Sequence, residues 1–148
     1  DEDRHIQMQV LYVREVLKLA MFEKAALNAD ADDIEAMEKI YEQMEKNLNE
    51  KIGYGDLDLK LHMQIAKATH NDIFPILVRT LYESSGQRMM LMEDLFPDSM
   101  KSIHRDHLGI VEAIKRRDVK TVRKVGKRHF DVDRYMLLSM NELEVGSK

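Results

Sequence analysis

Apolar residues recur at helical spacing along most of this chain, and this feature constrains its fold more than any other. The clearest stripe lies between residues 32 and 49 and consists of Ile34, Met37, Ile40, Met44 and Leu48. Such spacing places apolar side chains along one face of an α-helix. No window shows the alternation of a strand, and the 148 residues include only two prolines and six glycines. The sequence therefore predicts long helices with few breaks.

We expect six helices, over residues 3–28, 32–49, 57–69, 72–93, 99–116 and 118–141. On the first helix the expected inward stripe is Ile6, Val10, Val13, Leu17, Ala20 and Lys24. Aspartate or asparagine stands near most expected starts and can cap them: Asp30 or Asp32, Asp56, Asn71 or Asp72, and Asp118. Residues 1–148 are thus expected to form a single all-α domain, an antiparallel bundle of about six helices.

Composition excludes several classes of protein. The chain has no cysteine, so disulfides, thiolate catalysis and cysteine zinc sites are excluded. Its formal net charge of −4 argues against nucleic-acid binding by this chain itself. No apolar run approaches the roughly 20 residues of a membrane span, and the first residues do not resemble a signal peptide. We expect a cytoplasmic protein without membrane contact.

Polar side chains interrupt three of the apolar stripes. Asp58 and His62 are four residues apart, and therefore share a helix face with Ile65. His107 falls in the stripe formed with Ile103, Ile110 and Ile114. His129 falls in the stripe formed with Val122, Val125, Val132 and Met136. Three helices thus each place an imidazole where a core residue is expected, and one adds a carboxylate.

Burial of an unpaired carboxylate costs several kcal/mol or shifts its pKa until it is neutralised. A divalent cation held by Asp58, His62, His107 and His129 removes that cost for all four groups. Zinc is the metal ion that we expect first at such a set of ligands, and nickel, manganese or iron could also bind there. A simpler interpretation is that Asp58 caps its helix and the histidines make local hydrogen bonds. His5, His70 and His104 are expected at the surface or around the ligands.

Three other classes of function are compatible with parts of this pattern. A metal-dependent hydrolase would use the ion to activate water, but it would need a general base, and only His104 is a candidate. A ferritin-like di-iron protein needs two Glu-x-x-His pairs, and no glutamate stands three residues before His62, His107 or His129. A metal-free helical interaction module predicts instead that aliphatic residues in place of Asp58 or His107 stabilise the fold.

Four segments resemble the FCD domain, the ligand-sensing domain of FadR-type regulators in the GntR superfamily. Residues 58–71, DLKLHMQIAKATHN, resemble D-x-x-x-H-x-x-[ILV]-A-x-x-[ST]-x-N, and residues 105–118, RDHLGIVEAIKRRD, resemble E-H-x-x-[IL]-x-x-A-I-x-x-x-D. VRKVGKRHF resembles the final M-x-x-H-[LIF], and VREVLKLAMFEKAA resembles the first helix. The helix count resembles the shorter, VanR-like subgroup.

The resemblance implies that Asp58, His62, His107 and His129 hold a divalent metal, and that the chain is a sensor rather than an enzyme. It implies a homodimer, and DNA binding only through an N-terminal winged helix-turn-helix domain that this chain lacks. Lys18 stands where the family commonly has glutamate, and His70 stands where glycine is usual.

The implied effector is a small carboxylate bound at the metal. One aspartate and three neutral imidazoles leave a divalent ion with a net charge of about +1 and room for such a ligand. Arg14 is the first candidate to pair with the carboxylate, followed by Arg88 and Arg79 on the fourth helix. Asn71 is a further effector-contact candidate, although its simpler role is an N-cap.

Overall fold

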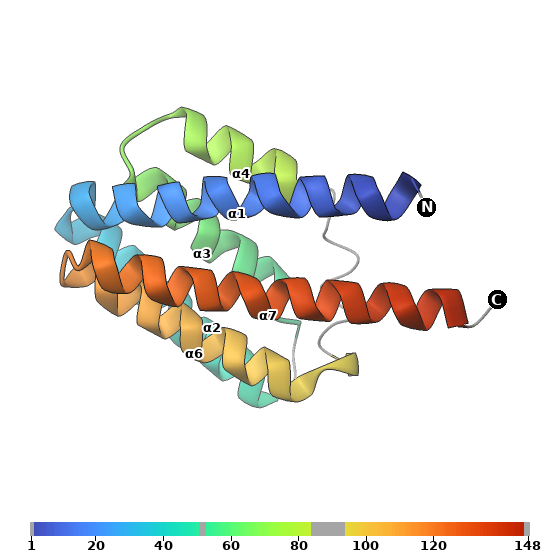
Figure 1. Ribbon diagram of the computed structural model, residues 1–148. Helices are drawn as coiled ribbons and strands as arrows, with labels where there is room; N and C mark the ends of the chain where they lie inside the picture. The colour runs from blue at the N-terminus through green and yellow to red at the C-terminus, as the bar shows by residue number, and fades with distance from the viewer. Residues whose placement is uncertain (1, 51–52, 84–93, 147–148) are drawn as a thin grey trace.

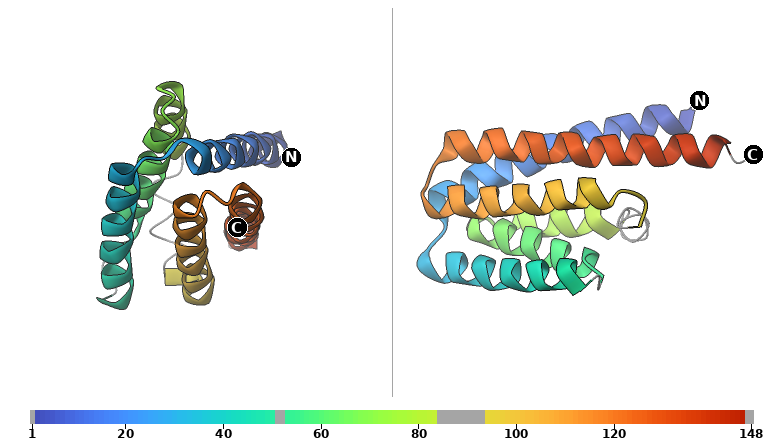
Figure 2. Two further views of the ribbon diagram at one scale, coloured as in Figure 1. Left: turned by 90° about the vertical axis from the view of Figure 1, so that its left-hand side faces the viewer. Right: turned by 90° about the horizontal axis from the view of Figure 1, so that it is seen from below.

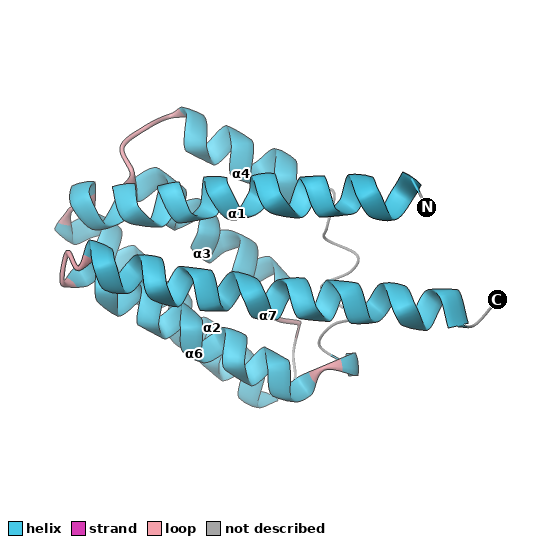
Figure 3. Ribbon diagram, viewed as in Figure 1, coloured by secondary structure: helices cyan, strands magenta, loops and turns pink. Residues whose placement is uncertain are grey.

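The structure, a computed structural model, describes residues 2–50, 53–83 and 94–146. Within these ranges the chain is helical, with short turns and no β-strand (Figure 3). The helices are α1 (Glu2–Asn28), α2 (Ala31–Glu50), α3 (Gly55–Ala68), α4 (Ile73–Glu83), α6 (Pro97–Lys115) and α7 (Val119–Gly146). The expected all-α fold is confirmed.

The helices run in alternating directions, so that both ends of the chain lie at the same end of the bundle (Figure 1). The longest two helices, α1 and α7, lie side by side, and α6 packs against α7. Helix α3 contacts α1, α2 and α4, and it lies between α4 and α2 (Figure 2). Side chains on the inner face of α3 therefore meet residues from several other helices.

Most helix boundaries agree with the sequence prediction. Asp118 caps α7 as expected, because its side chain accepts a hydrogen bond from Thr121 N at 3.0 Å. Asp56 does not cap α3, since the helix begins at Gly55 and Tyr54 occupies the N-cap position without a side-chain hydrogen bond. Helix α7 continues to Gly146, beyond the expected end at residue 141. The expected end of α4 near residue 93 lies outside the described residues.

The stripe expected to face the core on α1 is wrong. Ile6, Val10 and Val13 are 51%, 40% and 48% exposed. The buried face instead contains Leu11, Arg14, Lys18, Met21, Phe22 and Ala25. The error has a physical cause: α1 has two apolar faces, and two cations interrupt the one that is buried. Hydrophobic periodicity therefore favoured the face that the bundle leaves exposed.

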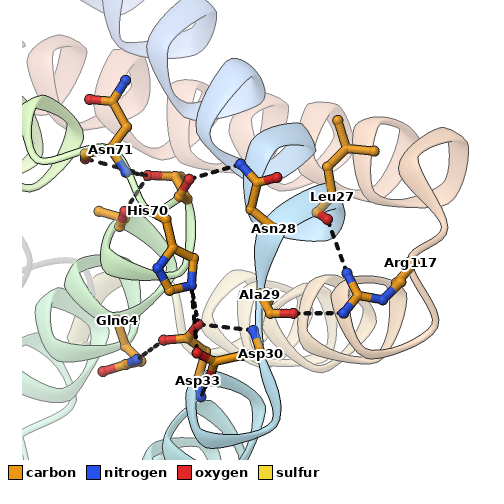
Figure 4. A network of polar contacts seen from close by, with 11 residues as sticks. Leu27, Asn28, Ala29, Asp30, Asp33, Gln64, His70, Asn71 and Arg117 are labelled. Carbon is orange, nitrogen blue, oxygen red and sulfur yellow. Dashed lines mark hydrogen bonds and ion pairs between the residues drawn. The ribbon is translucent and has the colours of Figure 1, made fainter.

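Polar contacts join the turns at one end of the bundle (Figure 4). Arg117, in the turn before α7, donates to the carbonyl oxygens of Leu27 at 3.0 Å and Ala29 at 2.8 Å. These bonds satisfy acceptors at the end of α1, which the helix itself leaves unpaired. In the described residues, no helix has the length and apolar character that crossing a bilayer requires.

Candidate metal centre

The four residues selected from the apolar stripes come together inside the bundle. Asp58 and His62 project from α3, His107 from α6 and His129 from α7, and each is at most 4% exposed. One ring nitrogen from each histidine lies within 4.8 Å of one ring nitrogen from each of the others. Three helices thus bring nitrogen ligands to one point, with the carboxylate of Asp58 beside them.

The Asp58 carboxylate and two imidazoles are in direct contact. Oδ1 of Asp58 lies 2.9 Å from Nε2 of His107 and 3.4 Å from Nδ1 of His62. His62 Nδ1 also lies 2.8 Å from the backbone oxygen of Asp58, one turn earlier on α3. A hydrogen bond from Nδ1–H to this carbonyl fixes the tautomer and leaves Nε2 with a free lone pair.

Several buried ring nitrogens lack hydrogen bonds. Among the described residues, His62 Nε2, His107 Nε2 and His129 Nδ1 are buried without a well-directed partner. Each buried polar atom that is left without a hydrogen bond lowers the stability of the folded protein by about 1–3 kcal/mol. Three such atoms close together are therefore unusual in a folded core. Coordination of a cation would satisfy all three lone pairs, so the donor set fits a divalent metal ion.

Two tyrosines contact the cluster, and neither was predicted from the sequence. The Tyr54 hydroxyl lies 2.9 Å from Nδ1 of His107 and 2.9 Å from Nδ1 of His104. The Tyr82 hydroxyl donates to Oδ2 of Asp58 at 3.2 Å. His104 is buried, so its place near the ligands agrees with one of the two expectations for it. Neither tyrosine stands in a polar pattern, and no sequence signal distinguishes them from core aromatic residues.

Burial and mutual contact shift the ionisation of the cluster. Burial raises the pKa of Asp58, but the imidazoles of His62 and His107 more than offset it, and the pKa lies well below its usual value. Burial lowers the pKa of His62 and lowers that of His129 much further. An ionised carboxylate beside neutral imidazoles is the protonation state that a metal ion requires of its ligands.

Two cations from α1 approach the same cluster. Arg14 is 8% exposed and Lys18 is 6% exposed. The Lys18 ammonium lies 5.1 Å from the centre of the Tyr82 ring, and the Arg14 guanidinium carbon lies 5.9 Å from it. The structure thus places Arg14 near the candidate ligands, and beside it Lys18, which was not among the site residues predicted from the sequence.

The remaining effector candidates lie elsewhere or outside the described residues. Arg88 falls in residues 84–93, which are not described. Arg79 is exposed. Asn71 is also exposed. Its side-chain oxygen accepts a hydrogen bond from Ile73 N at 3.0 Å, in agreement with the simpler role predicted for it, an N-cap of α4. Its contact with an effector stays a prediction.

A second group of possible ligands, Asp30, Asp33 and His70, lies near the surface (Figure 4). The backbone N–H groups of Asp30 and Asp33 donate to each other's carboxylates at 3.0 and 2.9 Å, which caps α2. His70 Nε2 lies 2.8 Å from Asp33 Oδ2. These side chains are thus already paired with one another.

Fold and site together define an all-α bundle with a buried histidine and aspartate cluster. Residues 9–132 match the FCD domain, and the chain belongs to this family. It is 23% identical over 140 residues to the Uxu operon regulator of Haemophilus influenzae, a match that covers 92% of this chain and 53% of that protein. The chain thus spans about half the length of this curated relative.

Two solved structures share the fold. E. coli McbR/YncC superposes with a TM-score of 0.78 at 13% identity, over 91% of this chain and 65% of that one. Streptococcus agalactiae GntR superposes with a TM-score of 0.74 at 19% identity, over 91% of this chain and 60% of that one. At these identities the likeness concerns the fold alone.

Proposed function

We propose that this chain is the sensor domain of a GntR-type transcription regulator, and that it binds a small organic acid through a divalent metal ion. One observation carries the proposal: Asp58, His62, His107 and His129 converge in the core, and three buried ring nitrogens of these histidines make no well-directed hydrogen bond among the described residues. Membership of the FCD family and the regulator names of the similar proteins support the regulatory part.

In this proposal Asp58 and one ring nitrogen of each histidine hold the ion, zinc foremost. A metal held by these residues would supply a Lewis-acidic position for one carboxylate oxygen of the effector. Arg14 then pairs with the other oxygen, since its guanidinium lies on the same Tyr82 ring that contacts Asp58. The function is binding, and we propose no catalysis: besides His104, the groups around the ligands are two cations and two phenols, which suit recognition of an anion.

The outer face of α1 supports a proposed homodimer. Ile6, Val10, Tyr12, Val13 and Val16 are each at least 40% exposed on this helix. Exposed apolar side chains in such number on one helix are typical of an interaction surface. DNA binding and a cytoplasmic location are part of the proposal for the whole regulator, whose reader domain would lie outside this chain.

Thermal unfolding with and without ligand tests the function. The protein is reloaded with zinc, then melted with small carboxylates and with amides of matched size. We expect carboxylates to raise the melting temperature, because ligand binding to the folded state stabilises it. The increase should disappear in a chelator and in Arg14→Met. Equal effects of acids and amides would contradict a carboxylate sensor.

A further inference from the structure

His104, on α6, lies next to the candidate metal centre without being one of its four ligands. It is 7% exposed, and its ring stacks on Tyr41 of α2 with ring centres 4.6 Å apart. Its Nε2 atom is buried and makes no well-directed hydrogen bond among the described residues. A buried imidazole with one unsatisfied nitrogen lowers stability, and an aliphatic side chain would fill the same space without that loss. Packing alone therefore does not explain a histidine at this position.

The other ring nitrogen of His104 is connected to His107 through Tyr54. The Tyr54 hydroxyl lies 2.9 Å from Nδ1 of each histidine, and all three side chains are buried. A phenol has one proton, so Tyr54 donates to one of these nitrogens and accepts a hydrogen bond from the other. Two arrangements of the protons are therefore possible, and they differ in which nitrogen of His107 is protonated.

Each arrangement suits a different state of the site. In the first, Nδ1–H of His104 donates to Tyr54, and Tyr54 donates to Nδ1 of His107. Nε2 of His107 then carries the proton, beside the ionised Oδ1 of Asp58 at 2.9 Å. In the second, Nδ1–H of His107 donates to Tyr54, and Tyr54 donates to Nδ1 of His104. Nε2 of His107 then keeps the lone pair that a metal ligand needs.

We propose that His104 is a positioning residue of the metal centre: it competes with His107 for the proton of Tyr54, and thereby favours the tautomer of His107 that can bind a metal. The inference rests on the proposed function and adds a residue outside the four ligands to its site.

The change from the first arrangement to the second leaves all three groups neutral. His107 releases the proton of Nε2 to water and takes the Tyr54 proton on Nδ1. Tyr54 takes the proton of Nδ1 of His104, and His104 takes one from water on Nε2. One proton is thus released and one is taken up. His104 should therefore change its tautomer when His107 becomes a ligand, although it does not contact the metal itself.

Zinc competition with a chromogenic chelator tests this role with two variants. His104→Phe keeps a ring that can stack on Tyr41 but removes the nitrogen that competes for the Tyr54 proton, so it should weaken zinc binding by about tenfold. His104→Asn places an amide where Nδ1 stands, and the amide oxygen can accept from Tyr54, so it should restore most of that affinity. A role in packing predicts the reverse ranking, because asparagine has no ring. Wild-type affinity in His104→Phe, or an affinity in His104→Asn no better than in His104→Phe, would overturn the proposal.

Nitrogen-15 spectra of labelled histidine give a second readout, which a role in packing would not change. In wild type at mildly alkaline pH, His104 should carry its proton on Nδ1 without metal and on Nε2 with zinc. In Tyr54→Phe at saturating zinc, this response should disappear. A His104 tautomer that is the same with and without zinc in wild type would overturn the proposal. If wild type binds no zinc, the metal centre and this inference fail together; if it binds zinc and His104 keeps one tautomer, only this inference fails.

Discussion

Nε2 of His107, on α6, lies 2.9 Å from Oδ1 of Asp58, on α3. This contact joins two helices through the interior of the bundle, and both side chains are at most 5% exposed. Asp58 also accepts a hydrogen bond from Tyr82 through its other oxygen. The carboxylate is therefore held rigidly, with one oxygen directed at the imidazoles.

Asp58→Asn should lower metal affinity by at least tenfold while the fold is retained. Asparagine keeps the shape of the side chain and can still accept the Tyr82 hydrogen bond, but it lacks the negative charge that binds a cation. The measurement is zinc competition with a chromogenic chelator, and Asp98→Asn, at an exposed position, serves as the control. Undiminished affinity in Asp58→Asn would exclude this carboxylate as a ligand.

Tyr54→Phe should weaken metal binding by about 10–100-fold, the usual effect of losing a partner that orients a ligand. The Tyr54 hydroxyl has one proton and stands 2.9 Å from two Nδ1 atoms, so it donates to one and accepts from the other. With His107 Nε2 on a metal, His107 Nδ1–H donates to Tyr54, and Tyr54 donates to His104. Nitrogen-15 spectra of labelled histidine report these tautomers.

Tyr41→Phe is the matched control, because Tyr41 stacks on His104 with ring centres 4.6 Å apart. It removes a hydroxyl next to the same histidine and leaves the Tyr54 bridge intact. If both variants bind metal like wild type, the hydroxyl of Tyr54 does not orient His107.

The metal-free protein should lose stability as the pH falls below about 6.5. Burial lowers the pKa of His62 and His129 from 6.5 in the folded state, so the unfolded chain takes up protons first. The free energy of unfolding therefore increases with pH across this range, and Asp58 adds a loss of the same sign only below about 3.8. Urea titrations at pH 5 and 7.5 in a chelator measure the difference. Equal or greater stability at pH 5 would contradict it.

Gly126→Ala should destabilise the protein by about 1–3 kcal/mol through overpacking. A Cβ at Gly126, on α7, would stand 2.7 Å from Cδ2 of Phe22, a buried side chain of α1. Gly53 has no atom within 4 Å of such a Cβ, so Gly53→Ala should change stability little. Chemical denaturation of the two variants gives the comparison, and similar free energies of unfolding would contradict close α1–α7 packing.

The sequence predicted the all-α fold and the four clustered residues, because both depend on local periodicity. A histidine in an apolar stripe faces inward wherever its helix packs. The outer contacts could not be predicted in this way. The bridge from Tyr54 to His104 and His107 depends on how α3 and α6 are packed, and tyrosine in a core position carries no signal of its partners. Lys18 was missed for the reason that misplaced the α1 stripe: a cation on a helix normally indicates its solvent face.

Zinc content tests the central claim most directly. Untagged wild type, His107→Ala and His129→Ala are each dialysed against zinc, desalted and measured by elemental analysis together with protein concentration. His70→Ala, which removes an exposed histidine outside the cluster, is the control. The account predicts about one zinc per chain in wild type and in His70→Ala, and a loss in both cluster variants. Wild type without zinc, and likewise without nickel or manganese after reloading, would contradict a metal centre in this bundle.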